Sequence, residues 1–157
     1  MKILLILTGK TTKEWITQGI NYYYDKILHY INFEINTINI TKPAGHLPDL
    51  IKNSEAEKQF KIIKKEDIVI LLDENGKSMN SKNFALFIEK LMNTISNKRV
   101  VFIIGGAYGF SKKIIERANF KISLSAMTFS HQVVRILFME QIYRAFTIIN
   151  NEPYHHA

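Results

Sequence analysis

An α/β domain built on a mainly parallel sheet, with helices on both faces, is the fold class that this sequence predicts. Short continuous apolar runs recur along the chain, and most are followed by a segment with helical periodicity. The runs are rich in β-branched residues, as is typical of parallel strands buried on both faces. No repeat, low-complexity tract or linker interrupts the 157 residues, so we expect a single domain over residues 1–157.

The chain begins with an expected strand, helix and strand. Residues 2–8 form a continuous apolar run that ends at Gly9, which predicts a buried strand. Residues 12–30 carry apolar side chains at steps of three and four, which indicates an amphipathic helix. Residues 33–40 place mostly β-branched and aromatic side chains at their apolar positions and predict a second strand. Residues 41–49 contain two prolines and a glycine, so we expect a loop there.

The middle of the chain continues the alternation. Residues 54–65 are mainly polar but are compatible with a helix. Residues 67–73 form another apolar run, and the pair Asn75-Gly76, a strong turn signal, is expected to end that strand. Residues 83–95 show the wide apolar face of a helix.

The last third of the chain holds the remaining elements. Residues 99–104 are a further buried strand that runs straight into the sequence GGAYG. Residues 112–118 predict a short helix capped by the hydroxyl of Ser111. Residues 120–124 predict a final strand, and the segment 124–146 closes the domain with a small-residue loop and a helix.

Composition limits the possible functions. The chain has no cysteine, which excludes disulfides, thiol catalysis and cysteine-ligated metal centres, and we expect no metal site. Its 21 lysines and arginines against 14 acidic residues give a net charge of +7, which favours a polyanionic partner such as nucleic acid. The first apolar run is too short for a signal-peptide core or a membrane span, so we expect a cytoplasmic protein without a membrane segment.

Two glycine motifs follow predicted strands. LTGKTT at residues 7–12 suggests a phosphate-binding loop, but the glycine that such a loop needs five positions before Gly9 is replaced by Leu4, so we interpret it as a turn. GGAYG at residues 105–109 lacks the spacing of a dinucleotide fingerprint. It is compatible equally with a simple turn and with a loop that approaches a ligand closely.

Three loops at strand ends are more informative together than singly. LSAMTF at residues 124–129 follows the last predicted strand, GGAYG follows the strand at 99–104, and a third loop follows Leu72. Ligands of parallel α/β sheets bind at the carboxyl ends of strands. The topology therefore predicts that these loops meet around one ligand about the size of adenosine.

The last helix carries charged groups on opposite sides. His131 and Arg135 share one face, whereas Glu140 and Arg144 share another. Arg135 and Arg144 are nine residues apart, which places them roughly 180° apart around the axis. Arg144 is therefore either a surface charge paired with Glu140, which helical geometry alone favours, or part of a site shared between two subunits. The tail places Tyr154 and His155, followed by a second histidine, either as a frayed end or as groups that contact a base.

The segments VFIIGGAYGF, LSAMTFSHQVVRILFMEQIYRAF and PYHH resemble the pseudouridine methyltransferases of the large ribosomal subunit, a family of the SPOUT methyltransferases. The resemblance extends over essentially the whole chain. It implies a C-terminal deep trefoil knot and a homodimer with the site at the subunit junction. Under that arrangement, the shared-site interpretation of Arg144 becomes the preferred one.

The resemblance also implies the chemistry. S-adenosylmethionine would donate a methyl group to N3 of pseudouridine 1915 in helix 69 of 23S rRNA, on assembled 70S ribosomes. Arg144 would stabilise the developing anion of the base, with Tyr154 and His155 holding the base or relaying its proton. His131 and Arg135 would order the loop-to-helix junction and the dimer interface. The residues that the resemblance assigns to the cofactor are Leu72, Gly105, Leu124, Ser125, Ala126, Met127, Thr128 and Phe129.

Two departures and two rival interpretations accompany this resemblance. Ser130 stands where the family usually has proline, and its hydroxyl can cap the helix instead. Tyr108 and Phe110 in the glycine loop differ from the smaller or acidic residues expected near position 108. One rival is a ribosome-binding module of the same fold without activity, against which the presence of Arg144 and Tyr154 argues. The other is an unknotted flavodoxin-like or Rossmann-like enzyme that uses a nucleotide or flavin.

Overall fold

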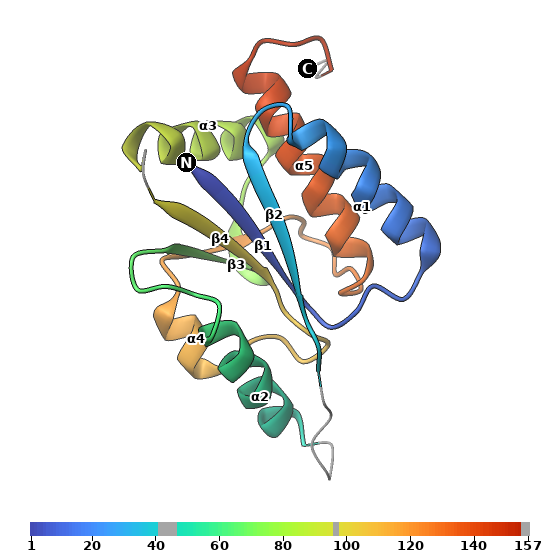
Figure 1. Cartoon of the computed structure of the whole chain (residues 1–157), viewed down its shortest axis with the longest axis vertical. Helices are drawn as coiled ribbons and strands as arrows, with labels where there is room; N and C mark the ends of the chain where they lie inside the picture. Colours follow the sequence, from blue (N-terminus) through green and yellow to red (C-terminus); the bar gives the residue numbers. More distant parts are fainter. Residues whose placement is uncertain (41–46, 96–97, 155–157) are drawn as a thin grey trace.

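The computed structural model describes residues 1–40, 47–95 and 98–154 and confirms the α/β class (Figure 1). Strands and helices alternate along the chain, as expected. The elements are β1 (Lys2–Thr8), α1 (Glu14–Ile27), β2 (Asn32–Ile38), α2 (Pro48–Phe60), β3 (Ile68–Ser78), α3 (Ser81–Thr94), β4 (Arg99–Ile104), α4 (Lys112–Arg117), β5 (Phe120–Ser123) and α5 (Val133–Ile149).

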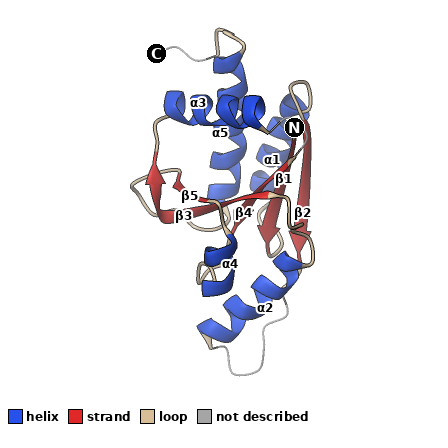
Figure 2. Ribbon diagram, turned by 90° about the vertical axis from the view of Figure 1, so that its left-hand side faces the viewer, coloured by secondary structure: helices blue, strands red, loops and turns tan. Residues whose placement is uncertain are grey.

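The strands form one five-stranded sheet in the order β2-β1-β4-β3-β5, and every pair is parallel. Helices α1, α3 and α5 cover one face, whereas α2 and α4 cover the other (Figure 2). The central strands carry continuous apolar runs because successive side chains enter opposite cores. Ile3 and Leu5 of β1 join the core beneath α1, α3 and α5, and Leu4 and Ile6 join the core beneath α2 and α4.

The second helix begins and ends earlier in the chain than the sequence predicted. α2 begins at Pro48 and ends at Phe60, whereas the sequence predicted residues 54–65. Proline suits the first turn of a helix, where its missing N–H would have no helical partner. In the sequence, Pro48 was interpreted as part of a loop. The predicted loop at 41–49 falls largely on residues 41–46, outside the described part of the chain.

The predicted turn at Asn75-Gly76 is wrong. β3 continues to Ser78, and its register against β5 shifts between Leu72 and Lys77, so the intervening residues form an irregularity inside the strand. A β-carbon on Gly76 would lie only 2.5–2.7 Å from backbone atoms of Ile122. The glycine is therefore required for the close approach of two strands rather than for a chain reversal.

We expect Gly76→Ala to lower the free energy of unfolding by about 1–3 kcal/mol, because the added methyl group must push β3 and β5 apart. Urea unfolding of the variant measures this loss. Asn75→Ala, at the exposed neighbouring position, is the matched control. Equal stability of the two variants would show that the β3–β5 contact tolerates a side chain.

After β5 the chain returns across the sheet, and α5 packs against both α1 and α3. The trefoil knot that the family resemblance implies stays a prediction. Within the described ranges, no helix combines the length and apolar character needed to cross a membrane.

Candidate active site

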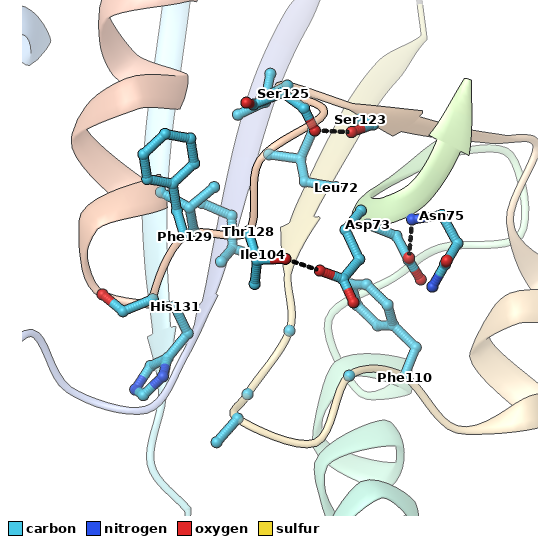
Figure 3. A pocket seen from close by; sticks show the side chains of 18 of the residues that line it. Leu72, Asp73, Asn75, Ile104, Phe110, Ser123, Ser125, Thr128, Phe129 and His131 are labelled. Carbon is cyan, nitrogen blue, oxygen red and sulfur yellow. Dashed lines mark hydrogen bonds between the residues drawn. The ribbon is translucent and has the colours of Figure 1, made fainter. Parts of the chain in front are cut away.

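The irregular segment of β3 and the loops at the carboxyl ends of β4 and β5 line a cavity of about 600 Å³ (Figure 3). This volume lies within the range of roughly 300–1,000 Å³ that is typical of small-molecule sites. The parallel sheet brings together segments near positions 72, 105 and 125 because neighbouring strands end at the same edge. The predicted convergence of the three segments is confirmed, but the segment after Leu72 is a continuation of β3 and not the expected loop.

Nearly all the residues assigned to a cofactor surround this cavity, although their role as ligands stays a prediction. The lining includes Leu72, Gly105, Leu124, Ser125, Met127, Thr128 and Phe129. Ala126, from the same loop, is not among the lining residues. His131 and Val134 extend the wall to the beginning of α5.

The cavity wall has a polar part that was not predicted from the sequence. Asp73, Glu74 and Asn75 line the cavity from the irregular segment of β3. Thr128 Oγ1 donates a hydrogen bond to Glu74 Oε2 at 2.9 Å, which connects the last loop to this segment. The signal available in the sequence was three consecutive polar residues after a buried strand. Because Asn75-Gly76 was interpreted as a turn, these residues were not predicted to line the cavity.

Serine hydroxyls shape the loop at residues 124–129. Ser123 Oγ donates to the carbonyl oxygen of Ser125 at 2.7 Å, and the Met127 N–H donates to Ser125 Oγ at 2.9 Å (Figure 3). Such local bonds fold the backbone without bulky side chains. The small hydroxyl residues of this motif therefore set the path of the chain along the cavity.

The glycine motif makes a tight turn and also lines the cavity. Its role as a loop that approaches a ligand stays a prediction. The Gly109 N–H donates to the Gly106 carbonyl oxygen at 3.2 Å, and Gly109 has a positive φ of 75°. A β-carbon on Gly105 would stand 3.2 Å from the ring of Phe110. Close packing thus explains the glycine at position 105, whereas the positive φ explains the glycine at position 109.

Beneath this turn lies Glu55 of α2, which sequence analysis did not single out. The residue is only 3% exposed, and its carboxylate accepts a hydrogen bond from the backbone of Gly106. A β-carbon on Gly106 would stand 2.4 Å from Glu55 Oε1. Burial raises the pKa of Glu55 to about 7, while the Gly106 hydrogen bond acts in the opposite direction.

This raised pKa predicts a pH-dependent stability. Between the ordinary value of 4.5 and about 7, folded Glu55 binds its proton more tightly than the unfolded chain does. The free energy of unfolding should therefore fall as pH rises through this window, by up to about 3 kcal/mol. Glu55→Gln should remove that dependence, because glutamine has no proton to lose.

Thermal unfolding across this pH range measures the effect. Glu57→Gln, at an exposed position of the same helix, is the control and should keep the wild-type slope. Glu55 would not be responsible for the dependence if both variants kept the same slope.

Arg135 connects the start of α5 to the loop after β1 through hydrogen bonds. Its side chain is fully buried, and it donates hydrogen bonds to Thr8 O at 2.9 Å, Thr11 Oγ1 at 2.7 Å and His131 O at 3.1 Å. The LTGKTT segment thus supplies two of the three acceptors for this arginine. Its Gly9 has a positive φ of 82°. The geometry supports the expected ordering of the loop-to-helix junction. Any contribution of Arg135 to a dimer would be indirect and stays a prediction.

Two neighbours complete the junction. Ser130 Oγ accepts a hydrogen bond from the Val133 N–H at 3.2 Å, so serine does cap this helix end. The His131 side chain lies at the cavity wall (Figure 3). Its pKa is lowered, first by burial and then by the charge of Arg135, so the imidazole is neutral at pH 7.

Arg144 lies away from the cavity, near the carboxyl end of α5. About 15 Å of helix axis separates it from Val134 at the cavity wall. Glu140 Oε1 accepts hydrogen bonds from Arg144 Nε at 2.8 Å and from Tyr154 Oη at 3.3 Å. The Arg144 guanidinium also stacks 4.9 Å from the centroid of the Tyr154 ring. His155 falls outside the described residues.

The segment after α5 has its own anchor. Tyr30 Oη donates to Glu152 Oε2 at 2.6 Å, and the Tyr30 ring stacks on Phe146 with centroids 5.6 Å apart. Asn151 adopts a positive φ of 55°, which turns the chain out of the helix. Burial raises the pKa of Tyr154, so its hydroxyl stays protonated at neutral pH.

Comparison with known proteins shows the family to which the chain belongs. The family described as "Predicted SPOUT methyltransferase" matches residues 1–155. The chain belongs to the SPOUT methyltransferases. Proteins named "Ribosomal RNA large subunit methyltransferase H" are similar over 157 residues and 99% of both chains: 49% identical in Christiangramia forsetii, 48% in Parabacteroides distasonis and 41% in Porphyromonas gingivalis W83. The resemblance recognised in the motifs is confirmed.

As a SPOUT methyltransferase, the protein is an enzyme that requires a methyl donor. The cavity offers backbone groups of two glycine-containing or small-residue loops, apolar side chains from Leu72 and Phe129, and the carboxylates of Asp73 and Glu74. This donor set suits a ligand with an apolar ring and a positive charge. In the part of the chain that the structure describes, no group of His, Asp and Glu residues is placed to hold a metal ion.

Proposed function

We propose that this protein transfers a methyl group from S-adenosylmethionine to N3 of pseudouridine 1915 in helix 69 of 23S rRNA, within the assembled 70S ribosome. Full-length similarity to proteins named as methyltransferases of ribosomal large-subunit RNA is the observation that carries the proposal. The cavity formed by the irregular segment of β3 and two strand-end loops supports it. With a ribosomal substrate, the enzyme would act in the cytoplasm.

S-adenosylmethionine would occupy the cavity and supply a methyl group activated by its sulfonium charge. Leu124 and Phe129 provide apolar surface for the adenine, and the loops carrying Gly105 and Ser125 provide backbone hydrogen-bonding groups. Glu74 and Asp73 favour a cationic ligand over a neutral one. The residues of this chain therefore fit the donor that the family generally uses.

The enzyme would act as a homodimer. In one subunit, α5 separates Arg144 and Tyr154 from the cavity. A transfer reaction needs the acceptor base within about 3–3.5 Å of the donor methyl group. Arg144 and Tyr154 of one subunit would therefore lie at the cavity of its partner. A site shared in this way requires the two arginines of α5 to be far apart.

Arg144 and its neighbours address the chemical problem of the acceptor. N3 of pseudouridine carries a proton at neutral pH and is a poor nucleophile until that proton leaves. The guanidinium of Arg144 would stabilise the negative charge that develops on the base. Glu140 holds Arg144 in place, and protonated Tyr154 would donate a hydrogen bond to the base rather than remove its proton. The relay of that proton remains assigned to His155.

The test is incubation with isotopically labelled S-adenosylmethionine and 70S ribosomes that carry or lack the pseudouridine, followed by mass spectrometry of the rRNA fragment. We expect label only on the fragment with pseudouridine. Calorimetric titration with S-adenosylmethionine should reveal a site of roughly micromolar affinity. Binding without transfer would favour the inactive RNA-binding alternative, and equal labelling of both ribosomes would refute the assigned target atom.

A further inference from the structure

The face of α2 that packs against the sheet is half polar. Its buried residues are Ile51, Glu55, Ala56 and Gln59. A helix that covers a sheet ordinarily buries an apolar stripe there. Glu55 and Gln59 are four residues apart, so they lie on the same side of the helix. The hydrophobic core does not account for this pair of polar residues.

Each member of the pair reaches the end of a neighbouring strand. Gln59 Nε2 donates a hydrogen bond to Thr8 Oγ1, at the end of β1, at 3.1 Å. The Glu55 carboxylate accepts a hydrogen bond from the backbone N–H of Gly106, in the turn that follows β4. Because β1 and β4 are adjacent and parallel, both contacts lie at the carboxyl edge of the sheet. This is the edge at which the cavity lies.

The Glu55 carboxylate also fits closely against the turn. A β-carbon on Gly106 would lie 3.0 Å from both Cδ and Oε2 of Glu55, and closer still to Oε1. Gly105 and Gly106 line the cavity on the other side of the same backbone, whereas Glu55 is not among the described lining residues. A shift of the carboxylate would therefore move part of the cavity wall.

Burying a carboxylate at this position is costly for the fold. Glu55 is 3% exposed, and in the described ranges no lysine, arginine or histidine forms an ion pair with it. Fully buried glutamates are ordinarily paired with a cation. Burial raises the pKa of Glu55, so the Gly106 hydrogen bond does not fully replace the lost solvation of the charged form. Departures of this kind from the usual pattern are expected at functional sites.

We propose that Glu55 is a positioning residue for the methyl donor: its carboxylate holds the Gly106 N–H, and thereby the turn at residues 105–109, in the shape that binds the donor. The inference rests on the proposed binding of S-adenosylmethionine in this cavity. α2 lies on the face of the sheet opposite α5, so Glu55 acts on the donor through the backbone of the turn (Figure 2). Loss of the acceptor should weaken donor binding and leave the transfer step unchanged once the donor is bound.

Calorimetric titration with S-adenosylmethionine tests the assignment with variants matched in size. Glu55→Met fills the space without an acceptor and should raise Kd about tenfold, the effect of one lost hydrogen bond. Glu55→Gln retains an acceptor oxygen and should stay within about threefold of wild type. KM for the donor should follow Kd, while kcat at saturating donor stays near wild type. Glu57→Met, at an exposed position of the same helix, is the control and should change none of these values.

Hydrogen exchange of the Gly106 amide is a readout that does not depend on the donor. In the protein without ligand, Glu55→Met should increase the exchange rate of this amide about tenfold at constant pH. Glu55→Gln should leave the amide protected, because the glutamine oxygen accepts the same hydrogen bond.

A double-mutant cycle tests the same contact if Glu55→Met does not fold. Gly106→Ala places a methyl group against the carboxylate and should weaken donor binding. In the Glu55→Asp background the shorter side chain makes room for that methyl group, so Gly106→Ala should have a much smaller effect there.

Four results would overturn the inference and leave the proposed function intact. They are equal donor affinity of Glu55→Met and wild type, equal weakening by Glu55→Gln and Glu55→Met, a loss of kcat alone, and additive effects of Glu55→Asp and Gly106→Ala. Absence of S-adenosylmethionine binding by the wild type would instead reject the proposed function. Exchange of the Gly106 amide would then still decide whether Glu55 fixes the turn.

Discussion

Replacing Arg144 by alanine should lower kcat for methyl transfer by about 10²–10³-fold, the effect expected when a group that stabilises transition-state charge is removed. Affinity for S-adenosylmethionine should stay within about twofold of wild type, because the cavity lies at the other end of α5. The division of labour follows from geometry: Arg144 contacts Glu140 and Tyr154, and it is not among the described residues that line the cavity of its own subunit.

Single-turnover transfer to ribosomes and calorimetric titration with S-adenosylmethionine separate these two effects. Arg144→Lys is the informative companion, since lysine keeps the charge but loses the planar fork that Glu140 now holds. Partial activity of the lysine variant would assign most of the effect to charge. Should Arg144→Ala instead abolish binding of S-adenosylmethionine, the assignment of this arginine to the acceptor base would be wrong.

Arg135→Ala should produce the largest loss of stability, about 3 kcal/mol or more, because it removes three hydrogen bonds from a charged donor and opens a cavity. The side chain is completely enclosed, and the carbonyl oxygen of Thr8 would lose the donor that the guanidinium supplies. Affinity for S-adenosylmethionine should fall as well. Arg135 holds the turn at His131, which forms part of the cavity wall.

Urea unfolding and calorimetric titration measure both consequences of this change. Arg135→Met fills the same space without donors, so it separates packing from hydrogen bonding. We expect its stability to lie between those of the alanine variant and the wild type. A methionine variant with wild-type stability and wild-type cofactor affinity would show that the three hydrogen bonds are dispensable.

The strands were predictable because a strand that is buried on both faces appears in the sequence as a continuous run of apolar residues. β1 and β4 coincide with the predicted runs 2–8 and 99–104, and the serine cap before α4 has the predicted partner, with Ser111 Oγ accepting from the Ile114 N–H. Parallel strand order also brings the three segments of the cavity wall to one edge, which topology alone anticipated, although the segment after Leu72 is strand and not loop. These features depend on short stretches of chain or on general rules for sheets.

The errors arose where one residue type serves two purposes. Glycine in Asn75-Gly76 suits a turn, but here it lets β3 approach Ile122, and Pro48 suits a loop, but here it begins α2. Glu55 carried no signal at all, because a glutamate in a polar helix is ordinarily exposed. In each case, the deciding neighbour is remote in the chain.

Residue order by itself determined the α/β class, the buried strands and the motifs that belong to SPOUT methyltransferases, because local periodicity and local spacing encode them. Tertiary structure alone decided that Arg135 is enclosed while Arg144 joins Tyr154 at the far end of the same helix, and that Glu55 supports Gly106. The physical reason is that burial and pKa depend on which distant segments pack around a side chain. No pattern within a short stretch of sequence contains that information.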